Sequence, residues 1–150
     1  MLFLGVVLNI ILCYILLGSS MLSMWRRNTL DKLVFVVDDN EVNLTAGAKA
    51  LENDYRVLTM PSAKMMFDLM ELKNQVPDLI LLDVEMPDMN GLLALAELKK
   101  REKWADIPVV FLTGWADDGL ESDAFDIGAH DMVGKPFKPD ELLACVKKYI

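Results

Sequence analysis

Polar side chains stand directly after four short apolar runs of the sequence. Asp38 and Asp39 follow LVFVV, Asp83 follows DLILL, Thr113 follows VVFL, and Lys135 follows DMVG. A single aspartate after a strand is usually a turn former or a helix cap, so no one position is informative. Four coincident cases are informative, because parallel strands bring their carboxyl ends to one rim of a sheet. The pattern predicts one polar site built from four segments of the chain.

The three carboxylates of this group, Asp38, Asp39 and Asp83, would repel one another and raise one another's pKa. A divalent cation removes that conflict. No histidine or cysteine lies near these positions, so the ligands are all oxygen atoms. Such a set suits Mg²⁺, with Mn²⁺ as the alternative, and disfavours zinc.

A carboxylate can also accept a phosphoryl group and form an aspartyl phosphate. Phosphoryl transfer needs positioning and charge neutralisation more than acid–base chemistry. The Lys135 ammonium would neutralise one phosphoryl oxygen, and the Thr113 hydroxyl would hydrogen-bond another. The sequence contains no pattern typical of a hydrolytic triad, a glycine-rich nucleotide loop or a redox motif.

The sequence between these residues supplies the elements that position them. Continuous runs rich in Val, Ile and Leu predict strands buried on both faces, at Leu33–Val37, Tyr55–Thr59, Leu79–Leu82, Ile107–Leu112 and Asp131–Gly134. Amphipathic segments of helical length alternate with them, at Glu41–Glu52, Ala63–Leu72, Leu92–Lys103, Asp117–Ile127 and Pro139–Tyr149. Five strands alternating with five helices predict an open parallel sheet covered on both faces.

Two of these helices are expected to turn a defined apolar face inward. For the first helix the inward residues are Val42, Leu44, Ala48 and Leu51. For the second they are Met66, Leu69, Met70 and Leu72.

Four motifs of the chain resemble those of the response-regulator receiver family, in the chemotaxis-regulator-like superfamily. VFVVDDNEVNL resembles its acidic-pair motif, and LILLDVEMPDMNG its phosphoacceptor motif. VVFLTGWA supplies the hydroxyl residue, and GAHDMVGKPF supplies the lysine followed by proline. The resemblance covers about residues 32–150. It implies a flavodoxin-like (βα)5 fold, a doubly wound parallel sheet with strand order 2-1-3-4-5.

The resemblance also implies a role for each site residue. Asp83 is the implied phosphoacceptor, and Asp38 and Asp39 are the metal-binding pair. Asp83 and a backbone carbonyl from Glu85 are further metal ligands. Thr113 and Lys135 are the implied switch and phosphate-binding residues, and the Lys135–Pro136 bond is expected to be cis.

One position departs from the family pattern. Receivers commonly carry Tyr or Phe three residues before the lysine, where the ring moves inward on phosphorylation. This chain has Met132 there. A methionine is flexible enough to respond to Thr113, but its simplest role is to fill the core.

The resemblance implies a single-domain response regulator in two-component or phosphorelay signalling. The phosphoryl donor would be a phosphohistidine on a histidine kinase or a histidine phosphotransfer protein, and the target protein stays unknown. Such a protein is not an enzyme beyond its own phosphotransfer and dephosphorylation. One alternative is a phosphorylation-independent interaction module. Another is a small phosphatase with an aspartate nucleophile, which would need Glu85 as its general acid.

The charge of the chain argues against nucleic acid as a partner. Formal net charge is −8, and residues 28–150 carry 13 basic and 23 acidic side chains. A polyanion is repelled by that field. Cys13 and Cys145 share no motif spacing, so neither a disulfide nor a zinc site is predicted. His130 is expected in a loop at the surface.

The first 25 residues contain no charged side chain, and Arg26 and Arg27 follow them. This run is long enough for an apolar helix that spans a membrane. The positive-inside rule then places the C-terminal side in the cytoplasm. The predicted organisation is a membrane helix at 1–25, a basic linker at 26–31 and a receiver domain at 32–150. The alternatives are a mis-assigned start, with synthesis beginning at Met21 or Met24, and a partner-binding helix.

Overall fold

The structure is a computed structural model that describes residues 31–114 and 118–150. The expected N-terminal helix, almost all of the basic linker, Cys13 and Trp115 lie outside the described residues. In the part of the chain that is described, no helix combines the length and apolar character needed to cross a membrane.

Five parallel strands form one sheet with the order β2-β1-β3-β4-β5. Their bounds are β1 Leu33–Val37, β2 Arg56–Met60, β3 Leu79–Asp83, β4 Val109–Thr113 and β5 Asp131–Gly134. This order confirms the flavodoxin-like fold expected from the sequence. The strand order reverses direction between β1 and β3, which in such sheets opens a crevice beyond the carboxyl ends of the strands.

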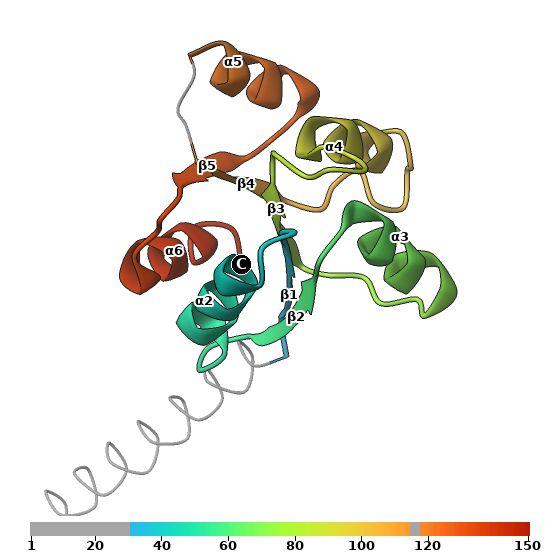
Figure 1. Cartoon of the computed structure of the whole chain (residues 1–150). Helices are drawn as coiled ribbons and strands as arrows, with labels where there is room; N and C mark the ends of the chain where they lie inside the picture. The colour runs from blue at the N-terminus through green and yellow to red at the C-terminus, as the bar shows by residue number, and fades with distance from the viewer. Residues whose placement is uncertain (1–30, 115–117) are drawn as a thin grey trace, which may run out of the picture.

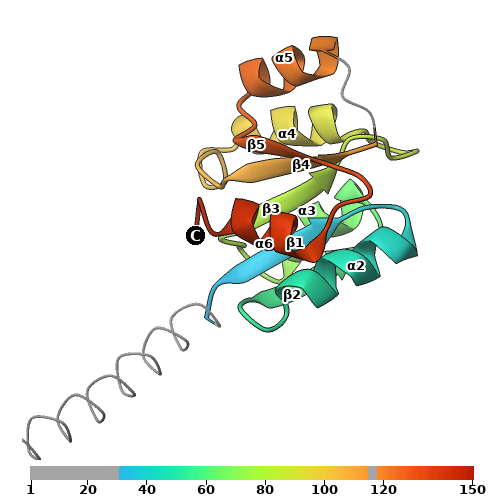
Figure 2. The ribbon, with the colours of Figure 1, turned by 90° about the vertical axis from the view of Figure 1, so that its left-hand side faces the viewer.

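Helices cover both faces of the sheet, as Figures 1 and 2 show. Two of them, α2 (Glu41–Leu51) and α6 (Pro139–Val146), lie side by side on one face. The other face carries α3 (Ala63–Leu72), α4 (Gly91–Lys99) and α5 (Asp118–Ile127). Helices α2 to α5 each connect two parallel strands and α6 follows β5, which is why the connections are long and the sheet is covered on both sides.

Alternate residues of each strand enter two separate apolar layers. In β1, Val34 and Val36 pack toward α2 and α6, whereas Phe35 and Val37 pack toward α3 and α4. All five residues of β1 are buried, as are those of β3 and β4. The continuous apolar runs of these three strands therefore reflect burial on both faces. The prediction was wrong for the edge strands β2 and β5, which are only partly buried.

Two residues assigned to inward faces are in fact exposed. Val42 is 74% exposed and Leu72 is 77% exposed. At about 100° per residue, Val42 lies roughly 160° around the helix from Leu44 and cannot share its face. Leu72 lies about 120° away from Met66 for the same reason. The inward face of α2 is formed by Leu44, Gly47 and Leu51 instead.

Helix α4 is shorter than the predicted segment Leu92–Lys103. It ends at Lys99, and a turn follows in which the amide of Arg101 donates to Leu98 and the amide of Trp104 donates to Arg101. The turn brings Trp104 into the apolar layer shared with α3 and α4, where it is almost completely buried. Burial of that large ring outweighs continuation of the helix.

Candidate functional site

The carboxyl ends of four strands carry the residues predicted from the sequence. Asp38 and Asp39 follow β1, Asp83 ends β3, Thr113 ends β4 and Lys135 follows β5. The strands are paired in register, with Asp83 opposite Leu112 and Thr113 opposite Gly134. These residues therefore share one rim of the sheet, as the sequence pattern predicts.

Three carboxylates converge at this rim. Asp38, Asp39 and Asp83 each offer an oxygen atom, and these oxygens lie within 4.8 Å of one another. Asp38 and Asp83 are buried, whereas Asp39 is exposed. A buried, all-oxygen set with an open side suits Mg²⁺, which binds through a few carboxylates and retains water or phosphate oxygens. The residues present thus fit the predicted cation.

Lys135 reaches across from β5 and joins two of these carboxylates. Its Nζ atom donates to Asp83 Oδ1 at 2.8 Å and to Asp38 Oδ2 at 3.0 Å. The lysine side chain is 17% exposed. One ammonium group therefore compensates two buried carboxylates, and the group as a whole keeps surplus negative charge.

The pKa values of Asp83 and Lys135 reflect this surplus of negative charge. Burial raises the pKa of Asp83 and the charge of Asp38 raises it further, against the opposing effect of Lys135. Burial alone would lower the pKa of Lys135, but its hydrogen bonds to Asp83 and Asp38 outweigh burial and raise it. The lysine is therefore held in its charged form at neutral pH.

Asp38 is fixed by the beginning of α2. Its Oδ1 atom accepts the backbone N–H of Asn40 at 2.9 Å, and the amide of Asn43 donates to both of its oxygens. Asn40 is the N-cap of α2, and its own side chain accepts from the Val42 N–H. The helix start and the acidic group are thus one hydrogen-bonded unit.

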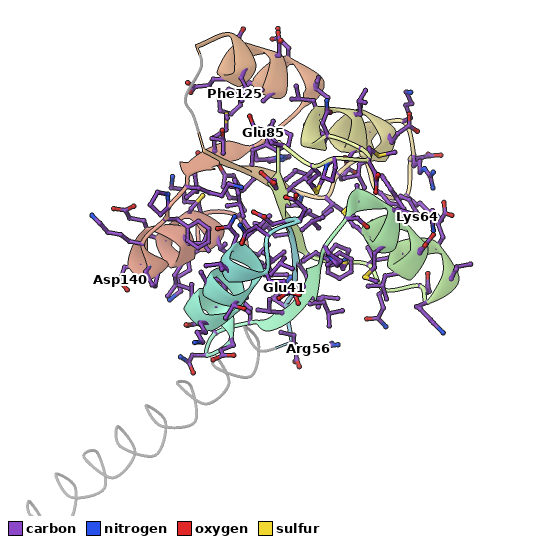
Figure 3. The ribbon with its side chains drawn as sticks, viewed as in Figure 1. Glu41, Arg56, Lys64, Glu85, Phe125 and Asp140 are labelled. Atoms are coloured by element: carbon purple, nitrogen blue, oxygen red, sulfur yellow. The ribbon has the colours of Figure 1, made fainter. Side chains whose placement is uncertain are left out.

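The loop after β3 holds the backbone of Asp83 in place. The Glu85 N–H donates to Asp83 Oδ1 at 3.3 Å, and the Gly91 N–H donates to the Val84 carbonyl. A Cβ atom at Gly91 would lie 2.3 Å from the Asp83 carbonyl oxygen, so only glycine fits there. Glu85 itself is exposed, and Figure 3 labels it in the loop beyond β3. Its carboxylate is not part of the group of three, and the metal-binding role of its carbonyl stays a prediction.

The end of β5 connects Lys135 to Thr113. The Lys135 N–H donates to the Thr113 carbonyl at 2.6 Å, and Thr113 is buried. The Lys135–Pro136 bond is cis, as the resemblance implied. Met132 is half-buried and packs against the apolar layer formed with α3, α4 and α5.

Sequence reasoning missed two residues that support the site. Asn43 and Gly91 both lie inside the motifs quoted above, but neither was assigned a role. For Asn43 the available signal was its position in the first turn of a helix that begins beside an acidic pair. For Gly91 it was the helix start that directly follows the Asn90 cap.

The chain matches a known protein family over almost all of its described residues. Residues 34–147 match the family model described as the response regulator receiver domain. The chain belongs to the response regulator receiver family. Phosphorylation-mediated signalling in two-component systems is the role of this family, and its members bind Mg²⁺ at an acidic pocket.

Curated relatives place this receiver among several kinds of regulator. It is 30% identical over 120 residues to the polar-differentiation response regulator DivK of Brucella ovis, covering 79% of this chain and 96% of DivK. It is 36% identical over 104 residues to a probable cyclic di-GMP phosphodiesterase of Vibrio cholerae, covering 69% of this chain. It is 32% identical over 117 residues to the phosphate regulon transcriptional regulatory protein PhoB of Pseudomonas aeruginosa. The receiver spans 23% of the phosphodiesterase and 50% of PhoB.

Solved structures agree with this fold. The chemotaxis protein CheY4 of Vibrio cholerae superposes with a TM-score of 0.73 at 23% identity, covering 79% of this receiver and 98% of CheY4. The BeF3-activated DrrB receiver domain superposes with a TM-score of 0.70 at 30% identity, covering 79% and 96% of the two chains. Receivers of this family interact with histidine kinases or phosphotransfer proteins and with downstream targets.

Proposed function

We propose that Asp83 is the phosphoacceptor of this receiver. The observation that supports this most strongly is its buried carboxylate at the end of β3, 2.8 Å from the Lys135 ammonium and grouped with Asp38 and Asp39. A carboxylate oxygen of Asp83 attacks the phosphorus atom of a phosphohistidine. The N–P bond breaks, and the imidazole nitrogen keeps the electron pair. The product is an aspartyl phosphate, and no general base is needed because the attacking group is already ionised.

Asp38, Asp39, Asp83 and the Glu85 carbonyl would hold Mg²⁺, with Mn²⁺ as the alternative. The cation supplies neutralisation of the negative charge on the phosphoryl oxygens. Its ligands come from β1, β3 and the loop after β3, which the rest of the fold already holds together. These carboxylates therefore need little rearrangement when the cation binds.

Lys135 and Thr113 would bind the phosphoryl group once it is transferred. Transfer converts the Asp83 carboxylate into an acyl phosphate, a mixed anhydride, and places three new oxygens beside it. The Lys135 ammonium would exchange its bond to Asp83 for one to a phosphoryl oxygen, as a mobile point charge can. The Thr113 hydroxyl would turn toward another oxygen. The Lys135 N–H already bonds to the Thr113 carbonyl, so both residues would respond together.

This response is the signal that a partner protein reads. The receiver would act by conformational change and protein contact, and turn over only its own phosphoryl group. Met132 lies three residues before Lys135 and packs against the core, so a methionine stands where receivers commonly carry an aromatic ring. The donor would be a histidine kinase or a histidine phosphotransfer protein.

The test is phosphorylation by a small phosphodonor with Mg²⁺, followed by intact mass. The wild type should gain one phosphoryl group and Asp83→Asn should gain none. Asp88→Asn is a matched control, because Asp88 is an exposed carboxylate in the same loop. Equal labelling of the wild type and Asp83→Asn would sink the assignment.

For the N-terminal segment we propose a membrane helix at 1–25, a basic linker at 26–31 and the receiver at 32–150. The uncharged run and the Arg26–Arg27 flank support a cytoplasmic receiver held at the inner face of the membrane. Such a tether would raise the local concentration of membrane-bound kinases around the receiver. Cell fractionation with an N-terminal mass measurement tests it. A protein recovered in the soluble fraction and starting at Met21 or Met24 would exclude the anchor.

A further inference from the structure

Asn43 is the polar side chain most closely bound to the buried carboxylate of Asp38. Its Nδ2 atom lies 3.2 Å from Asp38 Oδ1 and 3.1 Å from Oδ2. Asp38 is fully buried, and its other donors are the Asn40 N–H on Oδ1 and the Lys135 ammonium on Oδ2. Of these three donors among the described residues, Asn43 is the one shared by both oxygens.

Asn43 lies in the first turn of α2, close to the carboxylate that it binds. It is the third residue after the N-cap Asn40, where a side chain commonly reaches back to the N-cap N–H. Here Asp38 accepts that N–H instead. The Asn43 amide donates to the same carboxylate, so the Asn40 N–H and the Asn43 side chain both bind Asp38.

We propose that Asn43 is a positioning residue that holds the Asp38 carboxylate in the geometry the cation requires. The proposal rests on the function proposed above, since it assigns Asp38 to the metal site. Among the described residues, the Asn43 amide donates to Asp38 and not to Asp83, so it acts through Asp38. It also shares Oδ2 with Lys135. Without Asn43, Asp38 would depend more on Lys135 and draw that ammonium away from the phosphoacceptor.

The first test is Mg²⁺ affinity of the full chain in mild detergent, measured by calorimetry. Asn43→Ala should weaken binding by about 10-fold, as loss of a residue that orients a ligand typically does. Thr45→Ala is the matched control, an exposed position two residues along the same helix. Unchanged Mg²⁺ affinity in Asn43→Ala would overturn the proposal.

The second test asks whether Asn43 acts through Asp38. In an Asp38→Asn background, Asn43→Ala should have no further effect on Mg²⁺ affinity, because the carboxylate that it positions is gone. An equal loss in both backgrounds would show that Asn43 acts by another route, and would also overturn the proposal.

The third test needs neither the metal nor activity. Asn43→Asp is nearly isosteric and places an acidic residue in the first turn of a helix, which is favourable for the helix alone. A purely local role of Asn43 therefore predicts unchanged or higher thermal stability in EDTA. Positioning of Asp38 predicts a lower melting temperature, because a second carboxylate would face a buried one. The loss should disappear in the Asp38→Asn background.

A measurement on chains with native Asn43 covers the case in which its variants fail to fold. The side-chain amide resonance of Asn43 should shift when Asp38→Asn is introduced, and should also shift on Mg²⁺ addition to the wild type. An amide resonance that stays in place in both cases would count against the proposal. Labelling of Asp83 is measured separately, so failure here leaves the phosphoacceptor assignment standing.

Discussion

Two aspartates at opposite rims of the sheet, Asp83 and Asp131, each pair with a lysine and yet differ in their charge balance. Asp83 ends β3 and shares Lys135 with a second buried carboxylate. Asp131 begins β5 and accepts bonds from Lys148, Tyr149 and Cys145 through one oxygen. The first has too few donors for its charge, and the second has several.

The pKa values follow this difference. Burial and the charge of Asp38 raise the pKa of Asp83. Burial alone would raise the pKa of Asp131, but hydrogen bonds from Lys148 and the Met132 N–H outweigh it, and the pKa is lowered. Asp131 therefore joins α6 to β5 and stabilises the fold, whereas Asp83 keeps surplus charge that only a cation relieves. Stability is given up at the rim where chemistry is expected.

The largest expected effect is the loss of the lysine at the polar rim. Lys135→Met leaves two buried carboxylates without a counterion and should lower the free energy of unfolding by about 3 kcal/mol in EDTA. Lys148→Met should leave it unchanged within error, because that lysine is 63% exposed. Denaturant unfolding of both variants measures the contrast. An equal loss of unfolding free energy in both variants would contradict the proposed difference between the two rims.

A smaller effect of opposite sign is expected for the aspartates themselves. Asp83→Asn removes an unbalanced charge and should raise the melting temperature in EDTA at pH 7 by roughly 4 °C, near 1 kcal/mol for a domain of this size. Asp131→Asn should lower it by a similar amount, since it weakens several charge-assisted bonds. Calorimetric scans decide the matter, and a destabilised Asp83→Asn variant would contradict the surplus-charge interpretation.

The pH dependence of these differences sharpens the comparison. The folded-state pKa of Asp83 is raised, so its destabilising charge is present above that pKa and vanishes as pH falls through it. The stability gain of Asp83→Asn should therefore shrink as pH falls from 7 toward 3.8. The folded-state pKa of Asp131 is lowered, so its contribution is full above 3.8 and is lost only below it. Melting curves at several pH values in EDTA should show the Asp83 effect changing above pH 3.8 and the Asp131 effect changing below it.

The smallest expected effect concerns Cys145, which is buried beside Asp131. Burial raises the pKa of this thiol to about 11, and the charge of Asp131 contributes to the shift. Asp131→Asn should speed alkylation of native Cys145 by about threefold, because more thiolate forms while burial persists. Peptide mapping separates Cys145 from Cys13. A slower reaction in the variant would mean that Asp131 does not oppose thiol ionisation.

The sequence predicted the polar rim well because a simple rule connects it to the fold. Strands buried on both faces appear as continuous apolar runs, and their carboxyl ends must meet at one rim. β1 and β5 have the predicted bounds, while β2 and β3 are displaced or extended by one residue. β4 begins later than predicted, at Val109, because Pro108 has no N–H to donate to the sheet.

The individual side-chain hydrogen bonds could not be predicted from the sequence. The position of Asn43 in the first turn of a helix places it near the acidic pair, but the sequence does not show which carboxylate its amide binds. The bonds of Asp131 likewise join residues on different elements. Val42 shows a different limit, because counting apolar residues without their helical phase placed it on the wrong face.

The place where the chain enters the sheet determines how a membrane tether would present the domain. Lys32 directly precedes β1 and Asp38 directly follows it, so the two mark opposite ends of one five-residue strand. Lys32 and Asp38 are six residues apart, or about 20 Å along an extended strand. A span within residues 1–25 would hold the Lys32 end toward the lipid and point the acidic group into the cytoplasm. Anionic head groups would repel that group in the same direction. The phosphoacceptor would then face approaching kinases rather than the bilayer.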